Sequence, residues 1–271
     1  MLYSGSFRFE VVLKKRIKYI RKLLIIKKRF SGRSNNGNLI FYGRGGGFRS
    51  YYRLIDFKRL LINIPAKILQ FEYDPNRNIY IMLIGYLNGV LSYLLAPNLV
   101  RCNNYIFTGN VGLPQIGSMV SLLQCTTGSS IHCVKIGSVI AKYGRSSGIF
   151  IQLIRKIGYT VLLRFPSKEE RFILADNTCV LGRLSGEHVK LLKYTCAGFL
   201  RNLGYKPKVR GVAKNPVDHP HGGGEGRTTA GQPSVTPWGF YTKGSRTTTR
   251  FKRFNMNSWG FFKRRNNVVW Y

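Results

Sequence analysis

A mainly β fold built from small closed sheets is predicted by three observations. Short runs rich in β-branched and aromatic residues recur along the chain and are divided by Gly, Pro, Asn or Ser. A strong turn signal lies inside the most apolar stretch, and residues 119–195 lack long helical periodicity. Five-stranded barrels, among them the oligonucleotide-binding type, are built from strands of this kind. With 271 residues and 44% hydrophobic content, the chain can bury the cores of one or two small domains.

Residues 79–96 are eighteen uncharged residues in a row, long enough for a membrane-spanning helix. Asn88-Gly89 near their centre favours a type I′ turn, so we expect a buried β-hairpin instead of a span. Tyr73-Asp74-Pro75-Asn76 is a second turn signal, which joins a strand over Lys67–Tyr73 to the hairpin. Three antiparallel strands are therefore predicted.

The same pattern of short β-rich runs divided by Gly, Ser or Pro continues from residue 119 to residue 195. We expect strands over Ser130–Ile136, Ile149–Ile154, Thr160–Phe165 and Arg171–Leu174. After Gly204 the strand pattern ends, and Gly, Pro, Thr and basic residues follow. This region is too long for an ordinary loop and is predicted to be an extended functional or disordered tail.

The charge of the chain points to a polyanionic partner. Its 44 Lys and Arg against 10 Asp and Glu give a formal net charge of +34, which would repel itself in an isolated folded chain. Residues 1–60 hold 16 basic and 2 acidic residues, residues 61–200 hold 14 and 6, and residues 201–271 hold 14 and 2. RNA, DNA and an anionic membrane could each neutralise this charge. A balanced middle with basic ends favours a globular body whose arms lie along phosphates.

Residues 14–29 are basic and partly amphipathic, which fits a mitochondrial presequence, a membrane-surface helix or an RNA-binding arm equally well. Residues 31–53 mix Gly, Arg and aromatic residues, as segments that bind single-stranded RNA do. A flexible linker is the alternative for this second stretch.

The five cysteines are scattered and form no CxxC pair, which indicates a reducing compartment and no zinc site. The N-terminus shows no secretory signal with a small-residue cleavage site, so a cytosolic or organelle-matrix location is expected.

The most informative stretch is VRGVAKNPVDHPHGGGEG at 209–226. His219, His221, Asp218 and Glu225 are metal-ligand types, but their spacing on a glycine-rich coil is not that of a metal site. Asp218 could orient His219 as a general base, although no nucleophile lies in a recognisable elbow. Contact of both histidines with RNA is the favoured interpretation.

Several motifs carry a resemblance to one family. NPVDHPHGGGEGR at 215–227, VTPWG at 235–239 and TKG at 242–244 are its most specific matches. Upstream matches follow in the same order: SGRSNNG at 31–37, GGG at 45–47, YRLIDFKR at 52–59, EYDPNR at 72–77, LAP at 95–97, GRSSG at 144–148 and GEH at 186–188. From about residue 31 to residue 250 the chain resembles the universal large-subunit ribosomal protein L-two family.

This resemblance implies an oligonucleotide-binding-type barrel followed by an SH3-like barrel, with basic arms threaded into large-subunit ribosomal RNA. The expected divisions are a basic extension at 1–59, the first barrel at 60–118, the second at 119–200 and a tail at 201–271. Members support subunit assembly and association with the small subunit, and bring the HPH loop near the peptidyl-transferase centre. That loop corresponds here to Asp218, His219 and His221, for which a supporting role is expected because RNA forms the peptide bond.

Two regions depart from the family. The chain before Ser31 matches poorly, and residues 251–271 add aromatic residues to the usual basic ending. The richness in Ile, Asn, Phe, Tyr and Lys is typical of an AT-rich genome. We therefore expect a mitochondrial matrix location in the ribosome, with plastid stroma and bacterial cytoplasm as alternatives.

The leading hypothesis is a non-enzymatic structural constituent of the ribosome without a cofactor, apart from structural Mg²⁺ that accompanies folded rRNA. Its expected partners are large-subunit rRNA, neighbouring ribosomal proteins and the small subunit, with no membrane insertion and no homo-oligomer. The competing hypotheses are a hydrolase of RNA or esters that uses Asp218 and His219, and a membrane-surface anchor at 14–29. The residues expected to contact RNA are Arg44, Arg49, Arg53, Lys58, Arg59, Arg145, Arg201, Lys206, Lys208, Arg210, Asn215, His219, His221, Arg227, Lys243 and Arg246.

Overall fold

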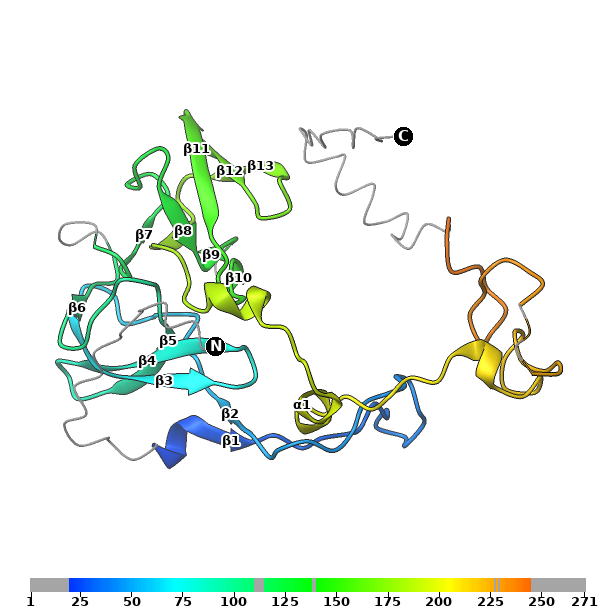
Figure 1. The fold of residues 1–271 in the computed structure, drawn as a ribbon. Helices are drawn as coiled ribbons and strands as arrows, with labels where there is room; N and C mark the ends of the chain where they lie inside the picture. The colour runs from blue at the N-terminus through cyan, green and yellow to red at the C-terminus, as the bar shows by residue number, and fades with distance from the viewer. Residues whose placement is uncertain (1–19, 110–114, 138–139, 227, 229, 245–271) are drawn as a thin grey trace. The chain divides into compact units, whose positions relative to one another are not determined.

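Two compact units make up the chain in a computed structural model that describes residues 20–109, 115–137, 140–226, 228 and 230–244. Among these residues, 20–27 and 50–192 form one unit, called the body here. Residues 28–49 and 193–244 form the second, called the arm unit. Figure 1 labels most of the strands and α1.

The first sheet of the body is antiparallel and has the strand order β5-β4-β3-β6. Its strands are β3 (Ala66–Asp74), β4 (Ile79–Tyr86), β5 (Leu91–Leu95) and β6 (Tyr105–Ile106). Strand β3 pairs with β4 from Ala66↔Tyr86 to Asp74↔Ile79. The three predicted antiparallel strands are therefore confirmed, and residues 79–96 form a hairpin. No helix in the described ranges is long and apolar enough to cross a membrane.

The turn of this hairpin differs from the predicted type I′ form. A type I′ turn needs positive φ at both central residues, but only Gly89 has one, at 82°, and Asn88 does not. The Gly89 amide donates to the Tyr86 carbonyl, and the Tyr86 amide donates to the Val90 carbonyl. The turn is thus one residue longer than predicted, and Gly89 occupies the left-handed bulge position after it.

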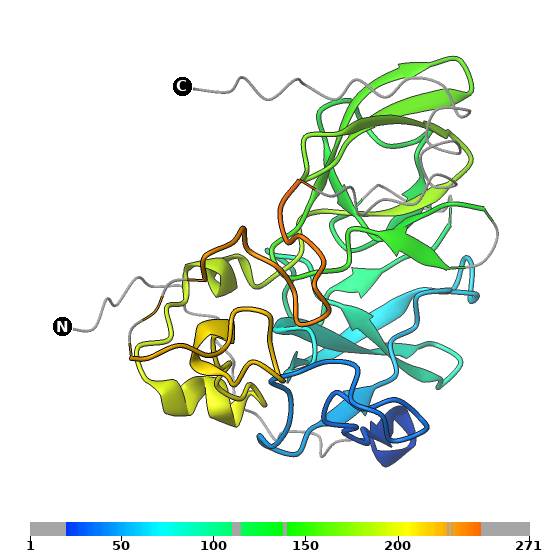
Figure 2. The same ribbon diagram turned by 90° about the vertical axis from the view of Figure 1, so that its right-hand side faces the viewer.

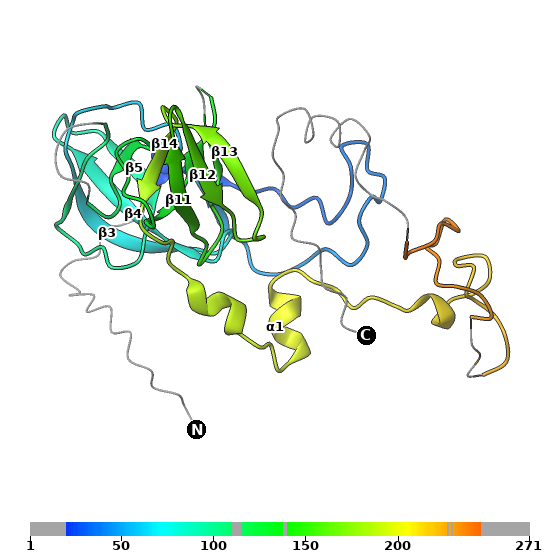
Figure 3. The ribbon, with the colours of Figure 1, turned by 90° about the horizontal axis from the view of Figure 1, so that it is seen from above.

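The second sheet of the body has six strands in the order β13-β12-β11-β8-β14-β7. They are β7 (Met119–Ser121), β8 (Ser130–His132), β11 (Ile151–Ile157), β12 (Thr160–Arg164), β13 (Glu170–Leu174) and β14 (Thr178–Leu181). Figure 2 shows these strands, in green, curling around a common interior, and Figure 3 shows β11, β12 and β13 side by side. The predicted strand over Ser130–Ile136 is broken at Cys133, whose φ is 49°. Beyond the break, β9 (Val134–Lys135) pairs with β10 (Ala141–Tyr143).

Three clusters of buried hydrophobic residues form the core of the body. One lies within the first sheet around Ile68, Met82 and Leu94, and another within the second sheet around Ile131, Leu153 and Val161. A third joins the two, because Ile81 and Leu83 of β4 share it with Met119 of β7 and Val180 of β14. The two sheets are therefore packed through a common apolar core. This mainly β architecture is consistent with the expected oligonucleotide-binding-type and SH3-like barrels.

The start of the described chain is not a long helix. A 3₁₀ turn, η1 (Arg21–Leu23), leads into β1 (Leu24–Ile26), which pairs antiparallel with β2 (Tyr51–Arg53). The described part of the stretch at 14–29 is therefore mostly extended, which contradicts a membrane-surface helix over residues 20–29. Residues 14–19 lie outside the described residues.

The arm unit contains little regular structure, as the composition of its tail suggested. Its helices are α1 (Ala197–Asn202) and the 3₁₀ turn η3 (Gly211–Ala213); η2 (Glu187–Leu191) lies at the end of the body. Two distant segments are joined in this unit. The amides of Gly45 and Phe48 donate to the carbonyls of Gly204 and Asn202, and the Lys206 amide donates to Gly43. Figure 1 shows this blue segment beside the yellow one that contains α1.

Candidate nucleic-acid interface

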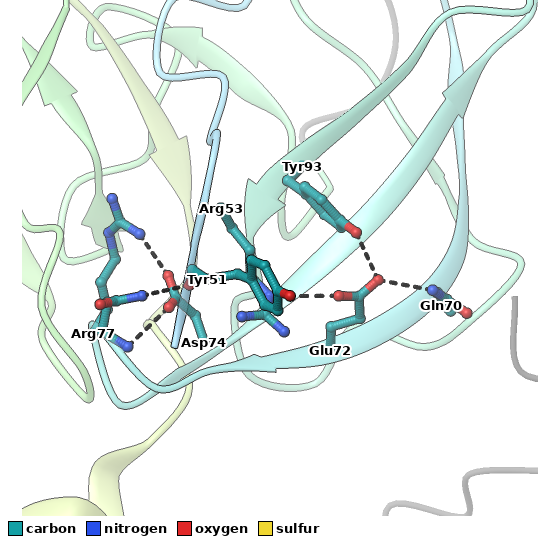
Figure 4. Close-up of polar contacts among 8 residues, drawn as sticks. Tyr51, Arg53, Gln70, Glu72, Asp74, Arg77 and Tyr93 are labelled. Atoms are coloured by element: carbon teal, nitrogen blue, oxygen red, sulfur yellow. Dashed lines mark hydrogen bonds and ion pairs between the residues drawn. The ribbon is translucent and has the colours of Figure 1, made fainter. Parts of the chain in front are cut away.

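Arg53 is buried in the body, where it serves the fold. Its Nε lies 3.5 Å from the Glu72 carboxylate, and the side chain is only 9% exposed. Tyr93 Oη donates to Glu72 at 2.8 Å, and Gln70 Nε2 donates at 2.9 Å (Figure 4). Burial and the Glu72 carboxylate raise the pKa of Tyr93 well above its usual value. The Arg53 cation is therefore already paired inside the β2–β3 region, and its contact with RNA stays a prediction.

Arg59 is also buried, with 5% exposure. Its Nη1 donates to the Gly117 carbonyl at 2.9 Å, and its own amide donates to Asp56 Oδ1 at 2.8 Å. Burial lowers the pKa of Arg59, but a guanidinium stays charged in proteins. Arg59 therefore holds the connection between 56–59 and Gly117, and its contact with RNA also stays a prediction.

Most of the other expected RNA-binding residues are exposed. On the body these are Lys58 and Arg145, and the Arg145 guanidinium lies 5.3 Å from the centre of the Phe57 ring. Arg227 and Arg246 lie outside the described residues. In the arm unit the exposed ones are Arg44, Arg49, Arg201, Lys206, Lys208, Arg210, Asn215 and Lys243. The arm unit thus presents the larger share of the expected phosphate-binding side chains.

Cations and aromatic rings alternate on the arm unit. The Arg44 guanidinium lies 4.0 Å from the centre of the Tyr205 ring and 5.6 Å from that of Phe41. Lys208 Nζ is 5.6 Å from the Phe41 ring, and Lys214 Nζ is 5.7 Å from the Tyr42 ring. These separations are in the range of cation–π attraction. Such stacking leaves the charges exposed while it limits the freedom of long side chains, so less entropy is lost when phosphate binds.

Sequence reasoning missed the partners in this arrangement. Tyr42, Tyr205 and Lys214 were not among the expected contact residues, although Tyr42 lies in the stretch of Gly, Arg and aromatics. The available signal was the recurrence of FYGR at 41–44 and YKPK at 205–208, each with an aromatic residue beside a cation. Their pairing depends on a contact between distant segments, which a local pattern cannot predict.

The two histidines of the tail are built into their own loop. The His219 residue is 7% exposed, and its ring lies so close to Gly211 that a side chain there would overlap it. The His221 amide donates to His219 Nδ1 at 3.0 Å, and the Val235 amide donates to His221 Nε2 at 3.2 Å. Partial burial, together with the neighbouring His221 and Lys214, lowers the pKa of His219. Each ring therefore accepts a backbone amide through one nitrogen, while His219 packs against Gly211 and His221 connects the HPH loop to Val235.

This geometry does not fit an Asp–His general base. In such a pair the imidazole Nδ1 donates its proton to the carboxylate. Here Nδ1 of His219 already accepts the His221 amide, so it cannot donate to Asp218 in the same state. Within the described ranges, no group of three or more His, Cys, Asp or Glu could hold a metal ion.

Comparison with known proteins finds two family models that match the chain. Residues 20–108 match the family model described as "Ribosomal Proteins L2, RNA binding N-terminal domain". Residues 115–239 match "Ribosomal Proteins L2, C-terminal domain". The two models together cover the body and most of the described arm unit.

Individual relatives agree over nearly the same length. The chain is 44% identical over 228 residues to the large ribosomal subunit protein uL2 of Methylococcus capsulatus, covering 83% of this chain and 82% of the relative. It is 41% identical over 243 residues to that of Thiobacillus denitrificans, with coverages of 88% and 87%. For Leptothrix cholodnii the identity is 42% over 221 residues, with 80% of each chain covered. On these matches and the fold that accompanies them, the chain belongs to the ribosomal protein L2 family.

Proposed function

We propose that this protein is a structural constituent of the large ribosomal subunit and binds large-subunit rRNA. The observation that carries the proposal is the match of residues 20–108 to the family's RNA-binding domain. Its relatives are named large ribosomal subunit proteins. The net charge of +34 supplies the electrostatic attraction that such binding needs. The protein is a structural component and not an enzyme.

The arm unit supplies most of the phosphate contacts in this proposal. Its exposed cations and stacked aromatic rings suit folded RNA, whose backbone is reached without entry into the deep groove. Lys58 and Arg145 add contacts from the body, while Arg53 and Arg59 support the fold from inside. Arg227 and Arg246 remain proposed contacts of the tail. The divisions at 1–59, 60–118, 119–200 and 201–271 remain the proposed functional boundaries.

Three finer roles belong to the same proposal. The loop with Asp218, His219 and His221 lies near the peptidyl-transferase centre. The shape of this loop supports the folded RNA of the centre. The protein supports assembly of the subunit and its association with the small subunit, beside neighbouring ribosomal proteins. It works in the mitochondrial matrix. The support for this location is the richness in Ile, Asn, Phe, Tyr and Lys, which is typical of an AT-rich genome. The relatives above are bacterial, so bacterial cytoplasm and plastid stroma are the alternatives that cell fractionation would test.

Sedimentation of a native lysate through a sucrose gradient tests the main proposal. The protein is expected to migrate with large-subunit RNA at low salt and after a high-salt wash, because a threaded arm dissociates slowly. Migration at the top of the gradient at both salt concentrations would contradict a ribosomal role. Ribonuclease treatment before sedimentation is the control, and it should release the protein.

A further inference from the structure

A hollow in the arm unit has no assigned occupant. It measures about 470 Å³ and is lined by Tyr42, Val209, Ala213, Lys214, Asn215, Asp218 and Pro237. This volume lies within the roughly 300–1,000 Å³ that pockets for small ligands occupy. The hollow combines one aromatic ring, one cation, one amide and one carboxylate with small apolar surfaces. Aromatic rings and hydrogen-bonding side chains are the groups with which proteins hold unstacked bases of RNA.

The aromatic and cationic sides of the hollow are placed together. Tyr42 is 52% exposed, so a ligand can reach this residue from solvent. Lys214 Nζ lies 5.7 Å from the centre of that ring. A base stacked on Tyr42 would therefore carry its phosphate within reach of Lys214. Base–aromatic stacking of this kind contributes to binding with any base, so it does not select one.

The polar rim is held rigid by its own backbone. The Asp218 amide donates to the Asn215 carbonyl at 3.0 Å, forming a turn that places both side chains at one edge. The Gly223 amide donates to the Lys214 carbonyl at 3.2 Å, and any side chain at Gly222 would overlap the Asn215 carbonyl. The glycine run therefore passes directly behind the turn. This rim is formed before a ligand arrives.

Among the residues of the rim, Asp218 restricts the chemistry of the ligand most. A carboxylate in a protein of net charge +34 repels the phosphates that the surrounding cations attract. As an ionised group it can only accept hydrogen bonds, so its favourable partner must present N–H groups. On the Watson–Crick edge, guanine presents two adjacent donors, N1–H and N2–H, which match the two carboxylate oxygens. Adenine, cytosine and uracil each present donors on one atom only.

We propose that this hollow binds one unpaired guanine nucleotide of the large-subunit RNA, selected by Asp218 and stacked on Tyr42. The inference rests on the proposed function and adds a base-specific site to it. Asn215 closes the edge of the site, and Lys214 neutralises the phosphate. The base is extruded from its helix, which places this contact among the single-stranded features that proteins read in RNA.

Kethoxal footprinting of isolated particles tests the site, because kethoxal reacts with N1 and N2 of unpaired guanine. A guanine protected in wild-type particles should become roughly tenfold or more reactive with Asp218→Asn and with Tyr42→Ala. Tyr42→Phe, which keeps the ring, should retain the protection. Asp176→Asn removes an exposed carboxylate of the body and is the matched control.

Two outcomes would overturn the inference while the ribosomal role stands. Variants could sediment with the subunit and show no guanine that responds to Asp218 and Tyr42. Alternatively, the responding base could be an adenine, cytosine or uracil, as read by reagents specific for those bases. Failure of the wild-type protein to sediment with the RNA would instead contradict the proposed function itself.

Nucleotide binding to the full-length protein gives an independent measurement if the variants fail to assemble. GMP and IMP carry the same phosphate and differ by the N2 amino group, so non-specific attraction to the cations is equal for both. The wild-type protein should bind GMP roughly tenfold more tightly than IMP, and Asp218→Asn should abolish this preference. Equal binding of GMP and IMP by the wild-type protein would contradict guanine selection.

Discussion

At the scale of single residues, the buried Arg53–Glu72 pair gives the clearest prediction. Arg53→Ala would remove the cation beside the buried Glu72 carboxylate and leave its Tyr93 and Gln70 donors in place. Removing one partner of a buried ion pair typically costs about 3–5 kcal/mol. A denaturant titration of the full chain should show this loss. Lys58→Ala, at an exposed position, should change the free energy of unfolding by no more than about 0.5 kcal/mol.

His219 offers a test that separates a structural role from a chemical one. The side-chain oxygen of Asn can accept the His221 amide as Nδ1 of His219 does, whereas Ala cannot. His219→Asn should therefore keep the slow hydrogen exchange of the His221 amide, and His219→Ala should lose it. Equal exchange rates in the two variants would show that the ring nitrogen does not hold the loop.

His132 predicts a pH dependence of stability. Burial, with Arg59 nearby, lowers the pKa of His132 to about 3, although the hydrogen bond to the Gly182 carbonyl acts in the opposite direction. Its pKa in the unfolded chain is about 6.5, so the unfolded state binds the proton first as the pH falls. The contribution to stability is complete above pH 6.5 and is lost below it, at up to about 1.4 kcal/mol per pH unit.

Unfolding curves between pH 7 and pH 5 check this slope. His132→Asn keeps a donor for Gly182 and has no titration, so it should flatten the pH dependence in this window. An unchanged slope in this variant would mean that other groups cause the acid sensitivity.

Which cations are exposed and which are buried was only partly predictable from the sequence. The exposed cations of the arm unit were identified from their basic surroundings, and most of them are exposed. Arg53 and Arg59 carry the same local signature, YRLIDFKR, and yet are buried. The carboxylate that pairs with Arg53 and the carbonyl that accepts from Arg59 lie on distant strands and loops. A local pattern does not contain this information.

At the scale of elements, the glycines at 46 and 47 form a natural pair of test and control. Both have positive φ, 67° and 83°, so a side chain strains either backbone. A side chain at 46 meets open space, whereas one at 47 would lie 2.7 Å from the Asn202 carbonyl oxygen and the Gly204 nitrogen.

Gly47→Ala should therefore separate the 43–48 segment from the end of α1, and Gly46→Ala should cost only about 1–2 kcal/mol of backbone strain. Hydrogen exchange at the Phe48 and Lys206 amides reports the pairing directly. Retention of slow exchange in Gly47→Ala would contradict the close packing at this point.

The strands show where pattern reasoning works. The β-rich runs that became β3, β4 and β12 were predicted within a few residues. The two-residue and three-residue strands β6, β7 and β10 were not, since their length is too short for a period to be visible. The turn at Gly89 and the break at Cys133 depend on positive φ values, and Cys carries no sequence signal for one.

At the scale of the whole molecule, the charge predicts how RNA binding responds to salt. An exposed cation that contacts phosphate contributes about 0.7–0.9 to the slope of log affinity against log salt concentration. Arg201→Gln should reduce the slope by about this amount. Arg164→Gln should change it less, because Arg164 is already paired with Glu170 at 2.8 Å.

Filter binding of large-subunit RNA across a salt series measures both slopes. A loss of affinity at Arg201 without a change of slope would indicate a base contact there. The direction of the overall salt effect could be predicted from composition alone, whereas the choice of residues requires the exposure of each side chain.

The pairing of residues 43–48 with 202–206 also determines how long the first segment waits for its partner during synthesis. About 150 residues separate Phe48 from its acceptor Asn202. At roughly 5–20 residues per second, the early segment waits on the order of ten seconds before its partner emerges. During that interval Phe48 and Arg44 lack the contacts that they make with Asn202 and Tyr205. The nascent chain thus passes through a period of risk of premature RNA capture or aggregation, which ends only after about three quarters of the chain has been made.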